Sequence, residues 1–108
     1  MMLTSDNFTE TVFTTNCNKL TIVQFTAAWC SSCQEFQTIL DQLMKLYPNN
    51  TITFCKVDVD QSPELADQYH VDKLPTVLFF KHRAVVDFVI GVETIEKFKR
   101  VINDNLNK

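Results

Sequence analysis

The stretch VQFTAAWCSSC, residues 23–33, runs from apolar and β-branched residues into two cysteines that are separated by two serines. The mostly apolar run over residues 20–27 predicts a strand that is covered on both faces. From Ser31 to Tyr47 apolar residues recur every three or four positions, which predicts a helix that ends at Pro48-Asn49-Asn50. The two cysteines therefore lie where a buried strand passes into a long helix.

The patterns on either side of this unit complete an alternation of helices and strands. We expect helices over residues 5–13, from 62 to about 69 and over 95–106, and strands over 51–59, 76–81 and 85–90. Ser5 and Ser62 are the expected helix caps, and Pro63 suits a first helical position. The strand, long helix and following strand predict a parallel crossover, and the short link His82-Arg83 predicts an antiparallel hairpin. The expected fold class is α/β, a mixed central sheet with helices on both faces, in the order α-β-α-β-α-β-β-α.

Length and charge narrow the function classes. A chain of 108 residues fits one domain, 1–108, and a net charge of −3 with mixed signs provides no basic stripe for nucleic acid. The longest apolar runs, such as residues 76–80, are too short for a bilayer, and the N-terminus has no secretory signal pattern. We therefore expect a cytoplasmic protein with reduced thiols, no membrane partner and a monomeric state.

The position of the two cysteines suits thiol chemistry. The first amides of a helix are unpaired and carry partial positive charge, so a thiolate at Cys30 is stabilised there. Such a setting lowers a cysteine pKa from about 8.5 to roughly 3.5–7.5. Cys30 is expected to stay accessible, and Cys33, one turn later, can close a disulfide with it. Cys30 would attack a partner's disulfide, and Cys33 would then release the reduced partner without a cofactor.

Other interpretations of the polar residues are less favoured. Half of a zinc site lacks a second ligand pair, because Cys17, Cys55, His70 and His82 do not form one at suitable spacing. Two cysteines that only pack would be poorly placed at a strand-to-helix junction. Cys55 is expected to be a buried small hydrophobe, the two histidines surface residues, and Cys17 either an incidental or an oxidation-sensitive thiol. Three acids are too scattered for a calcium loop and are expected at strand ends or caps: Asp58, Asp60 and Asp67.

Four segments, in the right order, resemble the thioredoxin family over nearly the whole chain: residues 23–33, FCKVDVD at 54–60, LPT at 74–76, and Gly91. The resemblance implies a thioredoxin-like fold and the reduction of protein disulfides, with Cys30 as nucleophile and Cys33 as resolving thiol. It implies no metal and no cofactor, and recharging by a thioredoxin reductase-like electron donor that draws on NADPH. Electron transport and cell redox homeostasis are the corresponding cellular roles.

The same resemblance assigns supporting residues. Trp29 would pack beside the dithiol, and Pro75 would lie against the disulfide after a cis Leu74–Pro75 bond. The backbone of Leu74 would bind an extended substrate segment, and Gly91 would leave room for it. The alternatives are a core aromatic at Trp29 and an ordinary trans proline at Pro75.

Two departures from the family pattern affect the chemistry. Ser31-Ser32 replaces the usual Gly-Pro between the cysteines, so the strongly reducing potential of about −270 mV cannot be assumed. Gln24 replaces a buried acid behind the dithiol, and Lys56 thereby loses its acidic partner. We hypothesise that Gln24 slows resolution of the mixed disulfide, so that Gln24→Asp speeds turnover at neutral pH. An oxidant or isomerase of the same fold and a non-catalytic interaction module remain the alternative functions.

Overall fold

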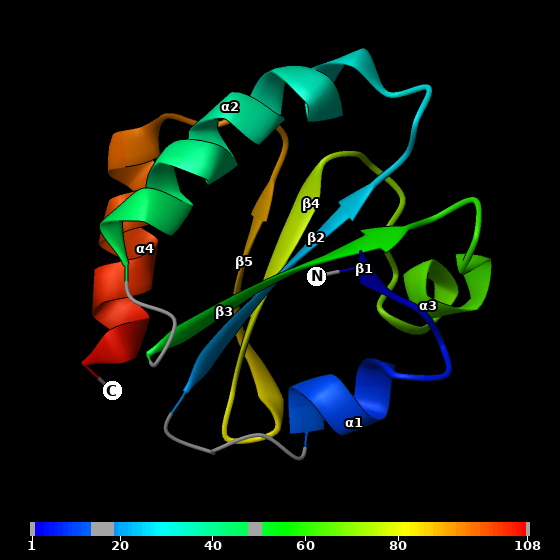
Figure 1. Cartoon of the computed structure of the whole chain (residues 1–108), viewed down its shortest axis with the longest axis horizontal. Coiled ribbons are helices and arrows are strands. Elements are labelled where there is room, and N and C mark those ends of the chain that lie inside the picture. The colour runs from blue at the N-terminus through cyan, green and yellow to red at the C-terminus, as the bar shows by residue number, and fades with distance from the viewer. Residues whose placement is uncertain (1, 14–18, 48–50, 108) are drawn as a thin grey trace.

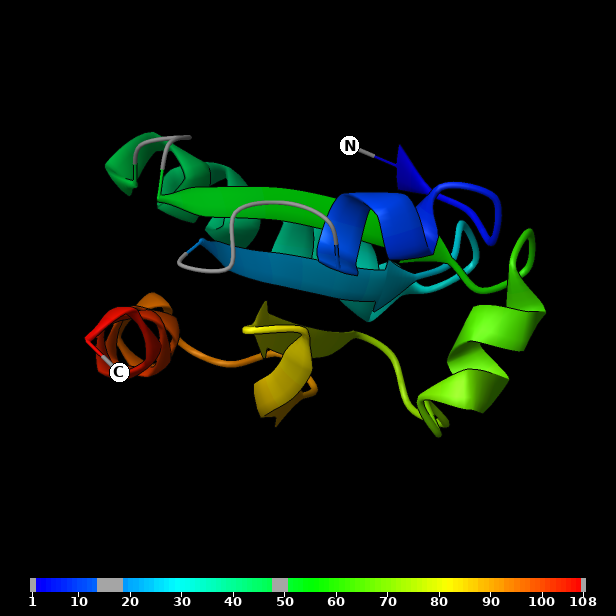
Figure 2. The same cartoon turned by 90° about the horizontal axis from the view of Figure 1, so that it is seen from below.

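The computed structural model describes residues 2–13, 19–47 and 51–107. The elements in chain order are β1 (Met2–Leu3), α1 (Phe8–Phe13), β2 (Leu20–Thr26), α2 (Ser31–Leu46), β3 (Ile52–Asp58), α3 (Pro63–Gln68), β4 (Thr76–Lys81), β5 (Ala84–Ile90) and α4 (Ile95–Leu106). The described strands form a five-stranded sheet in the order β1-β3-β2-β4-β5. Figures 1 and 2 show α2 and α4 on one side of this sheet and α1 and α3 on the other. The expected α/β class and mixed sheet are confirmed.

The centre of the sheet is the parallel pair β2–β3, in register from Leu20 opposite Ile52 to Thr26 opposite Asp58. β4 runs antiparallel to β2, and β5 antiparallel to β4, as expected for the hairpin. The edge strand β1 pairs in parallel with β3 and was not predicted. Two residues are too few to show a period, so only the pairing with β3 reveals this strand.

Alternation along β2 divides the core in two. Leu20 and Ile22 face α2 and α4, whereas Val23 and Phe25 face α1 and α3. On the first side the rings of Phe36 and Phe98 lie 4.9 Å apart between centroids and join α2 to α4. Burying a large apolar side chain contributes about 1.5–3 kcal/mol. The apolar cluster on each face of the sheet therefore holds the two helices of that face against the strands.

Of the two expected helix caps, Ser62 has the predicted N-cap position of α3, whereas Ser5 does not cap α1. Helix α1 begins at Phe8 rather than near Ser5, and the Ser5 hydroxyl donates to the Glu64 carboxylate instead. Ser62 does precede α3, with Pro63 at its start, but its hydroxyl makes no capping bond. A serine before an apolar run indicates a possible cap, yet the hydroxyl takes whichever partner the folded chain places nearest.

The β4–β5 turn is made by residues that rarely form one. His82 and Arg83 have φ of 55° and 67°, the left-handed region in which Asn and Gly are preferred. The strand before the turn is held at its end by Lys81, whose buried Nζ donates to the carbonyls of Asn105 and Leu106 at 2.9 and 3.3 Å. A cation at the C-terminus of α4 is favourable because the last helical carbonyls carry partial negative charge.

Candidate active site

Cys30 and Cys33 form a disulfide at the head of α2. Cys30 is the N-cap residue, and the backbone N–H of Cys33 donates to its Sγ at 3.2 Å, which confirms the predicted placement. The expected accessibility of Cys30 is wrong for this disulfide form, because its exposed fraction is 5% against 2% for Cys33. Ala27 and Leu74 pack around the pair and cover it.

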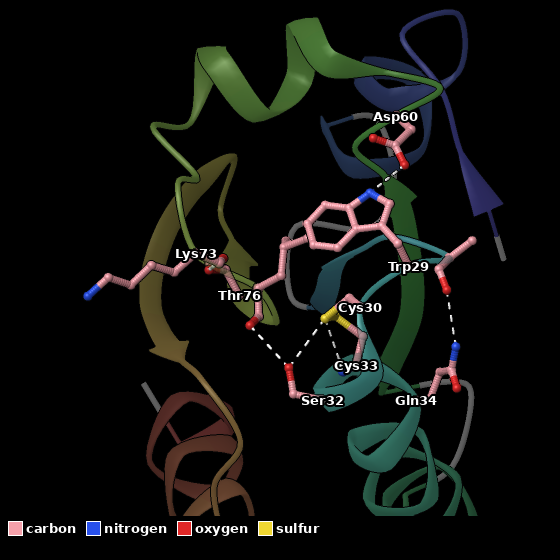
Figure 3. The surroundings of a disulfide bond; sticks show 10 residues. Trp29, Cys30, Ser32, Cys33, Gln34, Asp60, Lys73 and Thr76 are labelled. Atoms are coloured by element: carbon pink, nitrogen blue, oxygen red, sulfur yellow. Dashed lines mark hydrogen bonds between the residues drawn. A yellow bond between two sulfur atoms is a disulfide. The ribbon is translucent and has the colours of Figure 1, made fainter.

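Ser32 connects the disulfide to the chain segment before β4. Its Oγ lies 3.3 Å from Sγ of Cys30 (Figure 3). The same Oγ donates a long hydrogen bond, 3.5 Å, to the carbonyl of Leu74. The Leu74–Pro75 bond is cis, as the family resemblance implied, and Pro75 is buried. Ser31 is exposed. The second serine of the pair therefore contacts the reactive sulfur, whereas the first faces solvent.

Trp29 is a surface residue of the site, which rules out the core-aromatic alternative. Its side chain is 68% exposed, and its Nε1 donates to Oδ2 of Asp60 at 2.8 Å (Figure 3). Sequence reasoning gave Asp60 no role at the site. No local pattern pairs it with Trp29, since β3 brings it there from 31 residues further along the chain.

Gly91 lies at the end of the hairpin, and its backbone N–H donates to the Pro75 carbonyl at 2.8 Å. Its φ is 86°, and apart from Gly91 and its two chain neighbours no heavy atom of the described residues stands within 4 Å of the place where a Cβ would lie. The backbone conformation therefore explains the glycine here, because L side chains rarely adopt this φ. The expected role of this glycine in leaving room for a substrate stays a prediction.

Gln24 lies under α2 with an exposed fraction of 1%, opposite Lys56 in the parallel register. Neither its Oε1 nor its Nε2 has a hydrogen-bond partner in the described residues. Both side chains line a cavity of about 280 Å³. A buried amide without hydrogen-bond partners costs about 1–3 kcal/mol. Because the Gln24 amide and the Lys56 amine form part of the cavity wall, ordered water in the cavity can supply the missing hydrogen bonds.

The other candidates lie away from the disulfide. Cys55 is a buried free thiol, so the expectation of a buried small hydrophobe is confirmed, and burial raises its pKa. His70 and His82 are exposed as predicted, and Cys17 lies outside the described residues. Within the described ranges no three potential metal ligands gather, and none of the helices there is long and apolar enough to cross a membrane.

Comparison with known proteins places the chain among relatives of this architecture. Residues 1–104 match the family model of thioredoxin. Thioredoxin H-type 2 of Nicotiana tabacum is 40% identical over 78 residues, which span 72% of this chain and 64% of that protein. Thioredoxin H-type of Ricinus communis is 39% identical over 77 residues and is also matched over 64% of its length.

A bacterial relative and a solved structure are matched almost end to end. Thioredoxin of Buchnera aphidicola is 30% identical over 105 residues, 97% of this chain and 94% of that protein. The crystal structure of Malassezia sympodialis thioredoxin superposes with a TM-score of 0.84 at 24% identity, covering 97% of this chain and 89% of that one, a likeness of fold. Together with the model match, the relatives show that the chain belongs to the thioredoxin family.

Proposed function

We propose that this chain is a thiol–disulfide oxidoreductase that reduces disulfide bonds in proteins through Cys30 and Cys33. One observation carries the proposal: the two cysteines form a disulfide at the start of α2, with the Cys33 N–H directed at Sγ of Cys30. In the reduced protein the same amide and the positive end of the helix stabilise a Cys30 thiolate. A stabilised thiolate beside a second thiol is the chemical requirement for reversible dithiol exchange.

The reaction consists of two exchanges. The Cys30 thiolate attacks one sulfur of a substrate disulfide, so that a mixed disulfide forms and the other substrate sulfur leaves as a thiolate. Cys33 loses its proton and attacks Sγ of Cys30, which closes the intramolecular disulfide and releases the second substrate thiolate. The substrate gains two electrons and two protons, and the protein is recharged by a reductase-like donor that supplies two electrons.

The surface in front of Cys30 supports binding of a substrate segment. Trp29 is exposed beside the disulfide, and the cis bond at Pro75 places the Leu74 carbonyl within reach of Ser32. Gly91 lies next to Pro75, to whose carbonyl its N–H donates, and the space beside its Cα is free. We propose that an extended segment of a disulfide-containing protein binds here, in a single domain of residues 1–108, acting as a monomer in a reducing, cytoplasmic setting.

Disulfide reduction in insulin tests the proposal. The wild-type chain, with dithiothreitol as donor, should accelerate insulin precipitation well above the uncatalysed rate, and Cys30→Ser should return the rate to background. Thr38→Ser, on the exposed side of α2, is the matched control and should retain the wild-type rate. Equal activity of wild type and Cys30→Ser would overturn the proposal and favour a non-catalytic interaction module.

One contact favours an oxidant or isomerase as the second candidate. The Ser32 hydroxyl lies 3.3 Å from Sγ of Cys30 and, by turning from the Leu74 carbonyl, can donate to the thiolate. Such a bond stabilises the reduced form, which makes a dithiol pair more oxidising. The reduction potential, measured by equilibration with glutathione, separates the two directions. A value of about −180 to −120 mV would replace the reductase assignment with the oxidant or isomerase.

A further inference from the structure

The resolving cysteine faces a second pocket, on the side of the disulfide away from Leu74. This pocket has a volume of about 380 Å³ and is lined by Cys33, Thr26, Gln34, Gln37, Lys56 and Asp58, among others. Its volume is large enough for water, and the side chains of Thr26, Gln34, Gln37, Lys56 and Asp58 supply groups that can hydrogen-bond to it. Gln24 does not line it but lines the adjoining cavity, which shares Gln37 and Lys56 with it.

The parallel register explains which carboxyl group reaches this pocket. Gln24 stands opposite Lys56, and two residues further along both strands Thr26 stands opposite Asp58. Side chains two apart on a strand share a face, so Lys56 and Asp58 both lie on the face that α2 covers. The chain thus has an amide at Gln24 on β2, and the carboxylate of Asp58 lies two residues further along the sheet, on the neighbouring strand β3. Asp58 lines the same pocket as Cys33.

The charged groups around this carboxylate are few in the described part of the chain. β3 contributes the Lys56 amine, and the turn after it contributes Asp60, whose carboxylate binds Trp29. Helix α2 contributes neutral Gln34 and Gln37 to the pocket, and its Asp41 lines only the adjoining cavity. The facing charges are therefore one cation, which favours negative charge in the pocket, and one acid already engaged elsewhere.

Asp58 is held in place by one of its two oxygens. Its Oδ1 accepts from the backbone N–H groups of Asp60 and Gln61 at 2.9 and 3.3 Å. Its Oδ2 has no hydrogen-bond partner among the described residues, so it is available to a water in the pocket. Cys33 is buried, and burial disfavours its charged thiolate, so resolution requires a group that accepts its proton. A carboxylate can accept that proton, whereas the amide of Gln24 cannot.

We propose that Asp58 is the proton acceptor for Cys33 during resolution of the mixed disulfide, acting through water in this pocket. The inference rests on the proposed function, because it concerns the second of its two exchanges. As Cys33 attacks Sγ of Cys30, the bond from Cys30 to the substrate sulfur breaks and the substrate leaves as a thiolate. The Cys33 proton passes through water to Asp58 and then to bulk solvent, and Lys56 stabilises the negative charge that develops on Cys33.

Reaction of the reduced chain with Ellman's reagent separates the two exchanges in one stopped-flow trace. The first phase of thionitrobenzoate release reports attack by Cys30, and the second reports resolution by Cys33. The trace of the Cys30→Ser/Cys33→Ser variant is subtracted to remove the signal of the other thiols. Asp58→Asn is the test variant, because its side-chain oxygen can still accept from the Asp60 and Gln61 amides.

We expect Asp58→Asn to slow the second phase about tenfold or more at pH 7 and to leave the first phase unchanged. Between pH 6 and 8 its second phase should rise about tenfold per pH unit, as for attack that depends on hydroxide, whereas the wild-type rate varies less. Asp41→Asn, which removes the same charge beside Lys56 but outside the Cys33 pocket, should match wild type in both phases. Equal slowing by both variants, or an unchanged pH profile in Asp58→Asn, would overturn the role of Asp58.

A carboxylate placed behind the dithiol supplies an independent check. Gln24→Asp should accelerate the second phase strongly in the Asp58→Asn background. In the wild type it should accelerate that phase by less than about twofold, because an acceptor is already present there. This revises the expectation from the sequence alone, in which Gln24 slows resolution and Gln24→Asp speeds turnover. The same acceleration in both backgrounds would show that Asp58 accepts no proton. Loss of the first phase in the wild type would instead contradict the proposed function itself, so the two failures are distinguishable.

Discussion

The two sulfur atoms of one disulfide lie in different surroundings, although their residues belong to a single helical turn. Cys30 borders the side made by Ser32 and Leu74, with the Cys33 N–H directed at its sulfur and the Ser32 hydroxyl 3.3 Å from it. Cys33 borders the pocket that contains Lys56 and Asp58. The first setting stabilises a thiolate, and the second can remove a proton from a thiol. Under the proposed function, attack and resolution would be served by opposite sides of the same helix end.

The largest expected effect comes from removing the Cys33 thiol. In Cys33→Ser, Cys30 still attacks a substrate disulfide but no neighbouring thiol releases it. Turnover should fall at least about a thousandfold, because the effective concentration of an intramolecular thiol is lost. Mass spectrometry of the reaction with a disulfide peptide should show a stable one-to-one adduct. An adduct on Cys30→Ser instead would reverse the roles that the comparison assigns.

A smaller effect is expected from altering the surroundings of Cys30 alone. Ser32→Ala removes the hydroxyl that lies 3.3 Å from its sulfur. We infer that this hydroxyl donates to the Cys30 thiolate in the reduced protein and stabilises that form. The reduction potential should become more negative by about 30 mV, equivalent to about 1.4 kcal/mol for two electrons. Ser31→Ala is the matched control, since that side chain is exposed, and its potential should stay at the wild-type value. Equal shifts in both variants would mean that the dipeptide acts through the backbone rather than through the Ser32 hydroxyl.

The smallest effect concerns Cys55, a buried free thiol that lies in the middle of β3 rather than at a helix end. Burial raises its pKa, so the folded protein keeps its proton at a pH where the unfolded chain loses it. The resulting stability is complete below the unfolded value of about 8.5 and is lost as pH rises through the higher folded pKa.

Urea unfolding between pH 7 and 10 checks this sign by comparison with Cys55→Ala. The wild type should lose free energy of unfolding relative to the variant only above about pH 8.5, by at most about 1.4 kcal/mol per pH unit. The pKa values of Tyr47 and Tyr69 are also raised by burial, but both tyrosines are present in both proteins. Their contributions to the pH dependence therefore cancel in the comparison. Parallel pH profiles would show that Cys55 does not titrate differently in the folded state.

Sequence patterns were reliable where an element is long and buries one face. The apolar spacing of α2 and the continuous apolar run of β2 both predicted elements that the structure contains. The patterns failed at short or polar features. β1 has two residues, and the hydroxyls of Ser5 and Ser62 do not cap the helices that follow them. Such features depend on which groups the rest of the chain brings near, and no local period records that.

The site divides in the same way. Spacing and position identified Cys30 and Cys33, and the family resemblance supplied the cis bond before Pro75. Neither gave Asp58 or Asp60 a role beyond that of a strand end or cap. Asp60 binds Trp29 and Asp58 shares the Cys33 pocket only because β3 lies in parallel register beside β2.

By itself, therefore, the sequence determined the order of the long elements and the presence of a dithiol at a helix head, because both follow from periodicity and from residue order. Only the tertiary structure decided which groups surround each sulfur. Ser32 meets Leu74, and Cys33 shares its pocket with Asp58, across gaps of 42 and 25 positions in the chain. Strand register and helix packing create these neighbours, and they are properties of the whole fold rather than of any segment.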